Sequence, residues 1–104
     1  MHLQLIHKTT GGKLIRLQID YGKYAVERVR ITGDFFLHPE ESVGDLEAAL
    51  VNFSRDMDVE RLKQKLDAAL AIRSAELIGV DTKTLAGLIH EAVVPKDSIN
   101  DLDY

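Results

Sequence analysis

Four histidines are the residues of this sequence best suited to bind a metal ion, but their spacing does not favour a site. They are His2, His7, His38 and His90. None of them forms an i, i+4 pair, the spacing that places two imidazoles on one face of a helix, and they fall in different expected elements. The chain has no cysteine, which excludes thiolate metal sites, disulfides and cysteine nucleophiles. We therefore predict no metal-binding residues.

The run Thr10-Gly11-Gly12-Lys13 superficially resembles a phosphate-binding loop. A true loop of that kind needs an earlier glycine at fixed spacing and a Ser or Thr after the lysine, whereas Leu14 follows here and a strand is expected next. The run is instead typical of a hairpin turn. No Ser–His–Asp or paired-carboxylate arrangement can be recognised from order and spacing. We therefore predict no catalytic residue and no cofactor bound by this chain.

The segment from residue 31 to residue 37, Ile-Thr-Gly-Asp-Phe-Phe-Leu, holds two of the six aromatic residues. Gly33 can adopt a positive φ or allow close backbone approach, and Asp34 can bond to nearby backbone amides. Neighbouring strand residues point in opposite directions, so one of Phe35 and Phe36 should face the core and the other outward or under a helix. Two interpretations stay open: a tight turn with two core aromatics, or a partner surface formed by one Phe and Asp34.

The elements that position these residues begin with strands. Apolar and polar residues alternate with period two over residues 13–21, and shorter or less regular patterns cover residues 3–8 and 24–32. Turns are expected at residues 9–12 and 20–23. The alternation slips once near Glu27-Arg28, and a β-bulge there restores the register. A short apolar run, 35–37, ends at His38-Pro39.

Helical spacing of apolar residues then predicts three helices. The first begins at Ser42, with Asp45 completing a partial capping box, and its apolar face comprises Val43, Leu46, Leu50 and Phe53. The second begins at Asp56 or Asp58 and ends between Ile72 and Gly79, with an apolar stripe formed by Val59, Leu62, Leu66, Ala69 and Leu70. The third is capped by Asp81 and stopped by Pro95.

These elements predict an α+β fold, in which a small N-terminal antiparallel sheet of three to four strands carries about three C-terminal helices on one face. The 104 residues suffice for one domain, which we place at 1–94, followed by an acidic, flexible tail at 95–104. The net charge is −4 and the cations are spread along the chain, which disfavours a nucleic-acid partner. No apolar run reaches the ~20 residues of a membrane helix, and no signal peptide is recognisable, so a cytoplasmic location is expected.

Around residues 31–37 the chain resembles the small C-terminal domain of lipoate–protein ligases. The likeness covers residues 8–94 and is carried by Gly11–Leu14, Gly22-Lys23, Val29–Leu37, Pro39–Glu41, Leu46-Glu47, Leu50 and Leu77–Gly79. In that family the large domain binds lipoate and ATP and carries the catalytic lysine. It forms lipoyl-AMP and then transfers the lipoyl group to a lysine of a lipoyl domain, in a 2-oxoacid dehydrogenase E2 or the glycine-cleavage H protein. The small domain packs against it and serves chiefly the activation step; in some prokaryotes, notably archaea, it is a separate chain.

The resemblance implies that this chain is a non-catalytic accessory subunit of a bipartite ATP-dependent lipoate–protein ligase, acting in a heterodimer. ATP, Mg and lipoate then belong to the catalytic subunit, and the partner interface falls on Gly33, Asp34, Phe35 and Phe36. The chain lacks the large domain and Met1 falls where the small domain begins, so we expect a natural split; an excised domain stays open. The fold is also related to sulfur-transfer and iron–sulfur assembly proteins, whose cysteine chemistry this chain lacks. The alternative is a stand-alone protein- or ligand-binding regulatory module.

Overall fold

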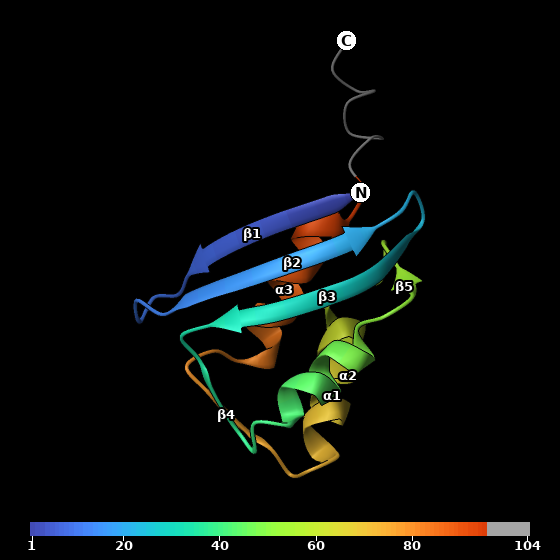
Figure 1. Ribbon diagram of the computed structural model, residues 1–104. Helices are drawn as coiled ribbons and strands as arrows, with labels where there is room; N and C mark the ends of the chain where they lie inside the picture. Colours follow the sequence, from blue (N-terminus) through green and yellow to red (C-terminus); the bar gives the residue numbers. More distant parts are fainter. Residues whose placement is uncertain (96–104) are drawn as a thin grey trace.

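A four-stranded antiparallel sheet, in the order β1-β2-β3-β5, forms one layer of the protein. The computed structural model describes residues 1–95, and the predicted tail beyond Pro95 lies outside the described residues. Three helices cover one face of the sheet (Figure 1). The predicted α+β architecture is therefore confirmed, with a separate two-stranded ribbon in addition.

The three long strands are β1 (His2–Lys8), β2 (Leu14–Tyr21) and β3 (Ala25–Gly33), each within a residue of its predicted bounds. The turn between β1 and β2 is closed by a hydrogen bond from the Gly12 amide to the Thr9 carbonyl, 2.9 Å. The Thr9 hydroxyl accepts a bond from the Lys13 amide at 3.1 Å. The predicted hairpin turn at residues 9–12 is therefore confirmed. A short strand, β5 (Phe53–Ser54), pairs with the beginning of β3.

A β-bulge in β3 lies at the predicted place. Asp20 pairs with Arg28, and the next residue, Tyr21, pairs with Val26, so that Glu27 has no partner on β2. The extra residue changes the alternation of the strand. As a result Val26 and Val29, which are three residues apart, are both fully buried.

The core lies between the inner face of the sheet and two helices, α2 (Val59–Ala71) and α3 (Thr82–Val93). The Asp58 carboxylate accepts a bond from the Arg61 amide at 2.8 Å, and Asp81 accepts one from the Thr84 amide at 2.7 Å. The caps predicted for these helices are thus confirmed, with Asp58 rather than Asp56 beginning α2. No helix within residues 1–95 has both the length and the apolar character needed to cross a membrane. The buried side chains are Ile15, Leu17, Ile19, Val29 and Ile31 from the sheet and Leu62, Leu66, Leu85 and Ile89 from these helices.

The first helix, α1 (Ser42–Ala49), departs from prediction in two respects. Its N-cap residue is Glu41, and no side chain caps it, so the capping box predicted from Ser42 and Asp45 is wrong. Asp45 instead accepts a hydrogen bond from Arg73 Nε at 2.7 Å. Phe53, predicted on the apolar face of this helix, is buried in β5. The reason is Asn52, whose φ of 54° reverses the chain after the helix has ended.

Ser42→Ala is expected to leave the free energy of unfolding unchanged or to raise it by up to about 1 kcal/mol. The Ser42 hydroxyl is buried and has no hydrogen-bond partner within residues 1–95, so alanine removes a polar group whose desolvation is not compensated. Urea unfolding measures the change. Asp58→Ala is the control, since it deletes a cap that is made and should cost about 1 kcal/mol. An equal loss in both variants would contradict the position found for Ser42.

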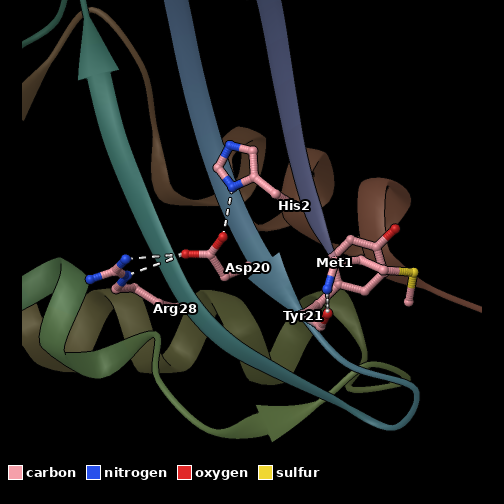
Figure 2. A network of polar contacts seen from close by, with 5 residues as sticks. All are labelled: Met1, His2, Asp20, Tyr21 and Arg28. Carbon is pink, nitrogen blue, oxygen red and sulfur yellow. Dashed lines mark hydrogen bonds and ion pairs between the residues drawn. The ribbon is translucent and has the colours of Figure 1, made fainter.

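Polar side chains join the three long strands on the face of the sheet that the helices leave open (Figure 2). His2 Nδ1 lies 2.6 Å from Asp20 Oδ1, and Arg28 Nη2 lies 3.2 Å from Asp20 Oδ2. Beside them, the Met1 ammonium donates to the Tyr21 carbonyl at 2.7 Å. The side chains of His2 and Arg28 are more than half exposed. Because exposed ion pairs contribute little, we expect this network to fix side-chain positions rather than to stabilise the fold strongly.

Asp20→Asn is expected to lower the melting temperature by a few degrees at most. We expect this loss only at pH values above the acid range. The hydrogen bond with His2, aided by Arg28, holds the pKa of Asp20 below its ordinary value of 3.8. A carboxyl whose pKa is lowered by folding stabilises the folded state above the unfolded pKa, and this contribution is lost as pH falls through the folded pKa. The difference between the native protein and Asp20→Asn should therefore be present at roughly pH 5 and absent at roughly pH 2. Thermal unfolding monitored by circular dichroism measures it, and a difference that persists at the acid end would contradict the assignment.

Candidate partner-binding site

A two-stranded ribbon, separate from the main sheet, carries the segment that the sequence singles out. It consists of β4 (Phe36–His38) and β6 (Glu76–Ile78), and Phe36 pairs directly with Ile78. Successive side chains alternate between its two faces. Leu37 is buried against the core, whereas Phe36 and Ile78 are 69% and 55% exposed. The outer face of the ribbon therefore presents two large apolar side chains to solvent.

The chain leaves the sheet for this ribbon through Gly33, which has a φ of 144°. A Cβ on this residue would lie 2.2 Å from the carbonyl oxygen of Leu14. The Asp34 amide donates to that same carbonyl at 2.8 Å, and the Asp34 carboxylate accepts a bond from the Leu14 amide at 3.2 Å. The positive φ, the close backbone approach and the role of Asp34 in fixing the turn are all confirmed. Both residues thus direct β4 away from β2 and β3.

The other strand of the ribbon is fixed by a second glycine. Gly79 has a φ of 100°, and a Cβ there would lie 3.3 Å from Phe35 Cα and 3.6 Å from the Asp34 carbonyl oxygen. The run 77–79 therefore lies directly against the run 34–37. These are two of the segments that carry the resemblance to the ligase small domain, and they are far apart in the sequence. Folding brings them into one site.

The two phenylalanines have different roles. Phe35 is half-buried and packs against the core, while Phe36 faces solvent. Of the four residues predicted at the partner interface, Gly33 and Asp34 shape the backbone, and Phe36 offers the largest exposed apolar surface. The predicted part of all four in partner binding stays a prediction. Ile78 was not predicted at this surface; the signal for it was the run Leu77-Ile78-Gly79, which places an apolar residue just before a glycine.

An open groove of about 430 Å³ adjoins the ribbon. Its one charged residue is the carboxylate-bearing Glu40, and its lining contains no Lys or Arg. Phosphate groups are usually held by cations or converging backbone amides, so this groove suits an apolar side chain of a protein better than a nucleotide. The lining residues are Ile31, Thr32, Gly33, Phe35, Phe36, Leu37, Glu40 and Val43.

Two of the four histidines, His2 and His90, make hydrogen-bonded contacts away from the ribbon. His90 Nδ1 lies 2.9 Å from the Met57 carbonyl oxygen, and His2 contacts Asp20. Within residues 1–95, no three His, Cys, Asp or Glu side chains lie close enough together to hold a metal ion. The exposed apolar pair Phe36 and Ile78 has the character of a docking surface for another protein.

The likeness of this chain to known proteins lies in its fold. No family model and no curated protein sequence matches the chain. Among solved structures, the chain matches one from an archaeal lipoylation system of Thermoplasma acidophilum, described as a bi-partite lipoate protein ligase and its E2 lipoyl domain. The TM-score is 0.64 at 23% sequence identity, and the match covers 86% of this chain and 97% of the other. This chain therefore has the fold of a chain from that lipoylation system.

Proposed function

We propose that this protein is the accessory subunit of a bipartite lipoate–protein ligase. The observation that carries the proposal is the fold match over 97% of a chain from a bipartite lipoylation system. The sequence resemblance to the ligase small domain also supports it, and the runs 34–37 and 77–79, which belong to the segments that carry the resemblance, meet in one site. The exposed pair Phe36 and Ile78 at that site gives the proposal a surface for the catalytic subunit.

The action of the subunit is to favour the conformation of the catalytic chain that activates lipoate. A partner that binds one conformation better than another shifts the population by the difference in its affinities. A rigid ribbon suits this task, because Gly33, Asp34 and Gly79 fix its backbone before any partner arrives and little entropy remains to be lost on binding. Ordering of the loops around the acyl-adenylate would then exclude water from it.

The reacting groups are assigned to the catalytic subunit. It would bind ATP, Mg and lipoate, form lipoyl-AMP, and transfer the lipoyl group to a lysine of an acceptor domain, such as the lipoyl domain of a 2-oxoacid dehydrogenase E2 or the glycine-cleavage H protein. The lack of Lys and Arg in the groove beside Phe36 supports this division of labour. The complex is expected to work as a heterodimer in the cytoplasm.

Reconstitution of lipoate activation tests the proposal. Pyrophosphate release by the catalytic chain is measured with ATP and lipoate, with and without this protein, and each chain is also assayed alone. A large gain that appears only when both chains are present is the expected result. No gain, with a catalytic chain shown to be folded and to bind ATP, would contradict the proposal and make the stand-alone binding module the better interpretation.

A further inference from the structure

The face of the sheet that the helices leave open is rich in cations. Side chains at alternate positions of each strand point to this face, opposite the buried residues. In this way β2 contributes Arg16 and β1 contributes Lys8, while β3 contributes Arg28 and Arg30, which follow the bulge. All four residues are exposed.

Three of these cations lie along a diagonal of the sheet. Arg16 pairs with Ile6 on one side and with Thr32 on the other. Lys8 lies two residues beyond Ile6, and Arg30 lies two residues before Thr32. Diagonal neighbours in an antiparallel sheet are about 7–8 Å apart, so Arg30, Arg16 and Lys8 form a continuous row of positive charge.

No acid forms an ion pair with this row among the described residues; the carboxylate of Asp34, two residues beyond Thr32, accepts a bond from the Leu14 amide. Lys8, Arg16 and Arg30 form no ion pair within residues 1–95. The carboxylate of Asp20 on the same face is engaged by His2 and Arg28 (Figure 2). Glu27 lies at the bulge, beyond Arg28 and at the far end of β3 from Thr32. Neighbouring like charges repel one another, so an acidic partner would relieve an unfavourable arrangement.

The row is unusual in an acidic protein. Residues 1–33 contain six Lys or Arg and two Asp or Glu, whereas residues 34–95 contain six Lys or Arg and twelve Asp or Glu. The chain as a whole has a net charge of −4. Positive charge is therefore gathered in the sheet and negative charge in the remainder, which would orient an approaching acidic surface toward the sheet.

We propose that the row Lys8, Arg16 and Arg30 docks an acidic surface of the acceptor domain. This inference rests on the proposed function and adds a second interface to it. Exposed charge pairs speed association more than they strengthen binding, which suits an acceptor that must arrive and leave in every turnover. The apolar ribbon at Phe36 and Ile78 suits the more lasting contact with the catalytic subunit.

A nucleic acid is the other class of partner that a basic sheet face could bind. Sheets that bind single strands do so with aromatic side chains on which the bases stack. The outward positions around the row are occupied by Gln4, Ile6, Gln18 and Thr32, none of which is aromatic. An acidic protein surface is therefore the occupant that this face fits.

The double charge reversal R16E/R30E tests the docking face. The reconstituted complex is assayed twice: for pyrophosphate release with lipoate and ATP, and for the KM of lipoyl transfer to an acceptor lipoyl domain. We expect pyrophosphate release to stay within about twofold of native and the acceptor KM to rise about tenfold at low salt. The acceptor KM of the native complex should rise with added salt, and this rise should be weaker in the variant.

R61E/K83E is the control: it changes two exposed helical positions and alters the net charge by the same amount as R16E/R30E, and it should leave the KM unchanged. Should R16E/R30E fail to fold, R16Q/R30Q gives the same test with a smaller expected effect.

Each remaining outcome overturns the proposal in a recognisable way. An unchanged KM would show that the face does not dock the acceptor. Binding of a labelled oligonucleotide to the native chain tests separately for a nucleic-acid partner, and neither result of that test would alter this conclusion. Loss of pyrophosphate release in R16E/R30E would assign the face to the catalytic subunit instead. If the native chain gives no gain in pyrophosphate release at all, the proposed function fails and this inference fails with it, whereas a gain with an unchanged KM removes this inference alone.

Discussion

Replacing Gly33 with alanine is expected to lower the free energy of unfolding by about 3–5 kcal/mol, enough to unfold much of the protein. The added Cβ would lie 2.2 Å from the Leu14 carbonyl oxygen and 3.0 Å from Ile15 Cα. Both are backbone atoms of β2, which is hydrogen-bonded to β3, so neither can withdraw without disrupting the sheet. The φ of 144° adds strain for any residue with a side chain. Urea unfolding monitored by circular dichroism measures the loss.

Two other glycines provide matched controls for this substitution. At Gly44 in α1 and Gly87 in α3, no atom apart from the adjacent residues and the helix's own backbone lies within 4 Å of the position a Cβ would take. Because alanine favours a helix more than glycine does, Gly44→Ala and Gly87→Ala should be neutral or stabilising by up to about 1 kcal/mol. A Gly33→Ala protein as stable as these two variants would contradict the close contact between Gly33 and β2.

Replacing Phe36 with alanine is expected to leave the fold intact and to impair the action on the catalytic subunit. The side chain is 69% exposed, so its removal costs little core packing. A large aromatic at the centre of an interface commonly contributes 2 kcal/mol or more, which corresponds to about a 30-fold rise in the concentration of this protein that gives half-maximal pyrophosphate release. Ile78→Ala should act in the same direction, because Ile78 is the direct cross-strand partner of Phe36.

Two aromatic residues distinguish loss of the interface from loss of stability. Tyr24 is also highly exposed, at 76%, but lies in the turn between β2 and β3, away from the ribbon. Tyr24→Ala should therefore leave the half-maximal concentration unchanged. Phe35→Ala should instead lower the melting temperature, because Phe35 packs against the core. If Phe36→Ala behaves like Tyr24→Ala in the activation assay, the ribbon is not the surface that meets the catalytic subunit.

The strands, the bulge and the caps of two of the three helices could be predicted because each depends on local sequence. Period-two alternation locates β2 within a residue, and one slip in it locates the bulge at Glu27. Asp58 and Asp81 each cap the helix that follows them. In these cases the residues that determine the structure lie within a few positions of one another.

The errors concern features that depend on distant contacts. Phe53 has helical spacing from Leu50 and is buried, as expected, but a turn at Asn52 places it in β5. Ser42 has the residue type and spacing of a cap, yet its hydroxyl makes no such bond. Strand β6 has only three residues, too few for a periodic pattern, and forms because β4 is there to pair with it.

The backbone features of the candidate site could be predicted where they depend on local sequence, and its exposed side chains could not, because they depend on distant contacts. Gly33 and Asp34 could be recognised from their types and from the interruption of the strand pattern. Which phenylalanine faces solvent depends on how β4 leaves the sheet, and the contribution of Ile78 depends on the pairing of β4 with β6. Both became evident only with the three-dimensional contacts.

The ribbon is attached to the sheet by the backbone contact at Gly33 and to the core by the inward side chain of Leu37, and its two strands are held together at Gly79; the side chains that it exposes take no part in this. The positions that determine the fold of the ribbon, Gly33 and Gly79, are therefore different from the positions proposed to contact a partner, Phe36 and Ile78. Under the proposed function, we expect relatives to differ at positions 36 and 78 and to keep both glycines, which a comparison of their sequences would check. A designer could use the same separation to retarget the subunit to a foreign catalytic chain with substitutions confined to those two positions.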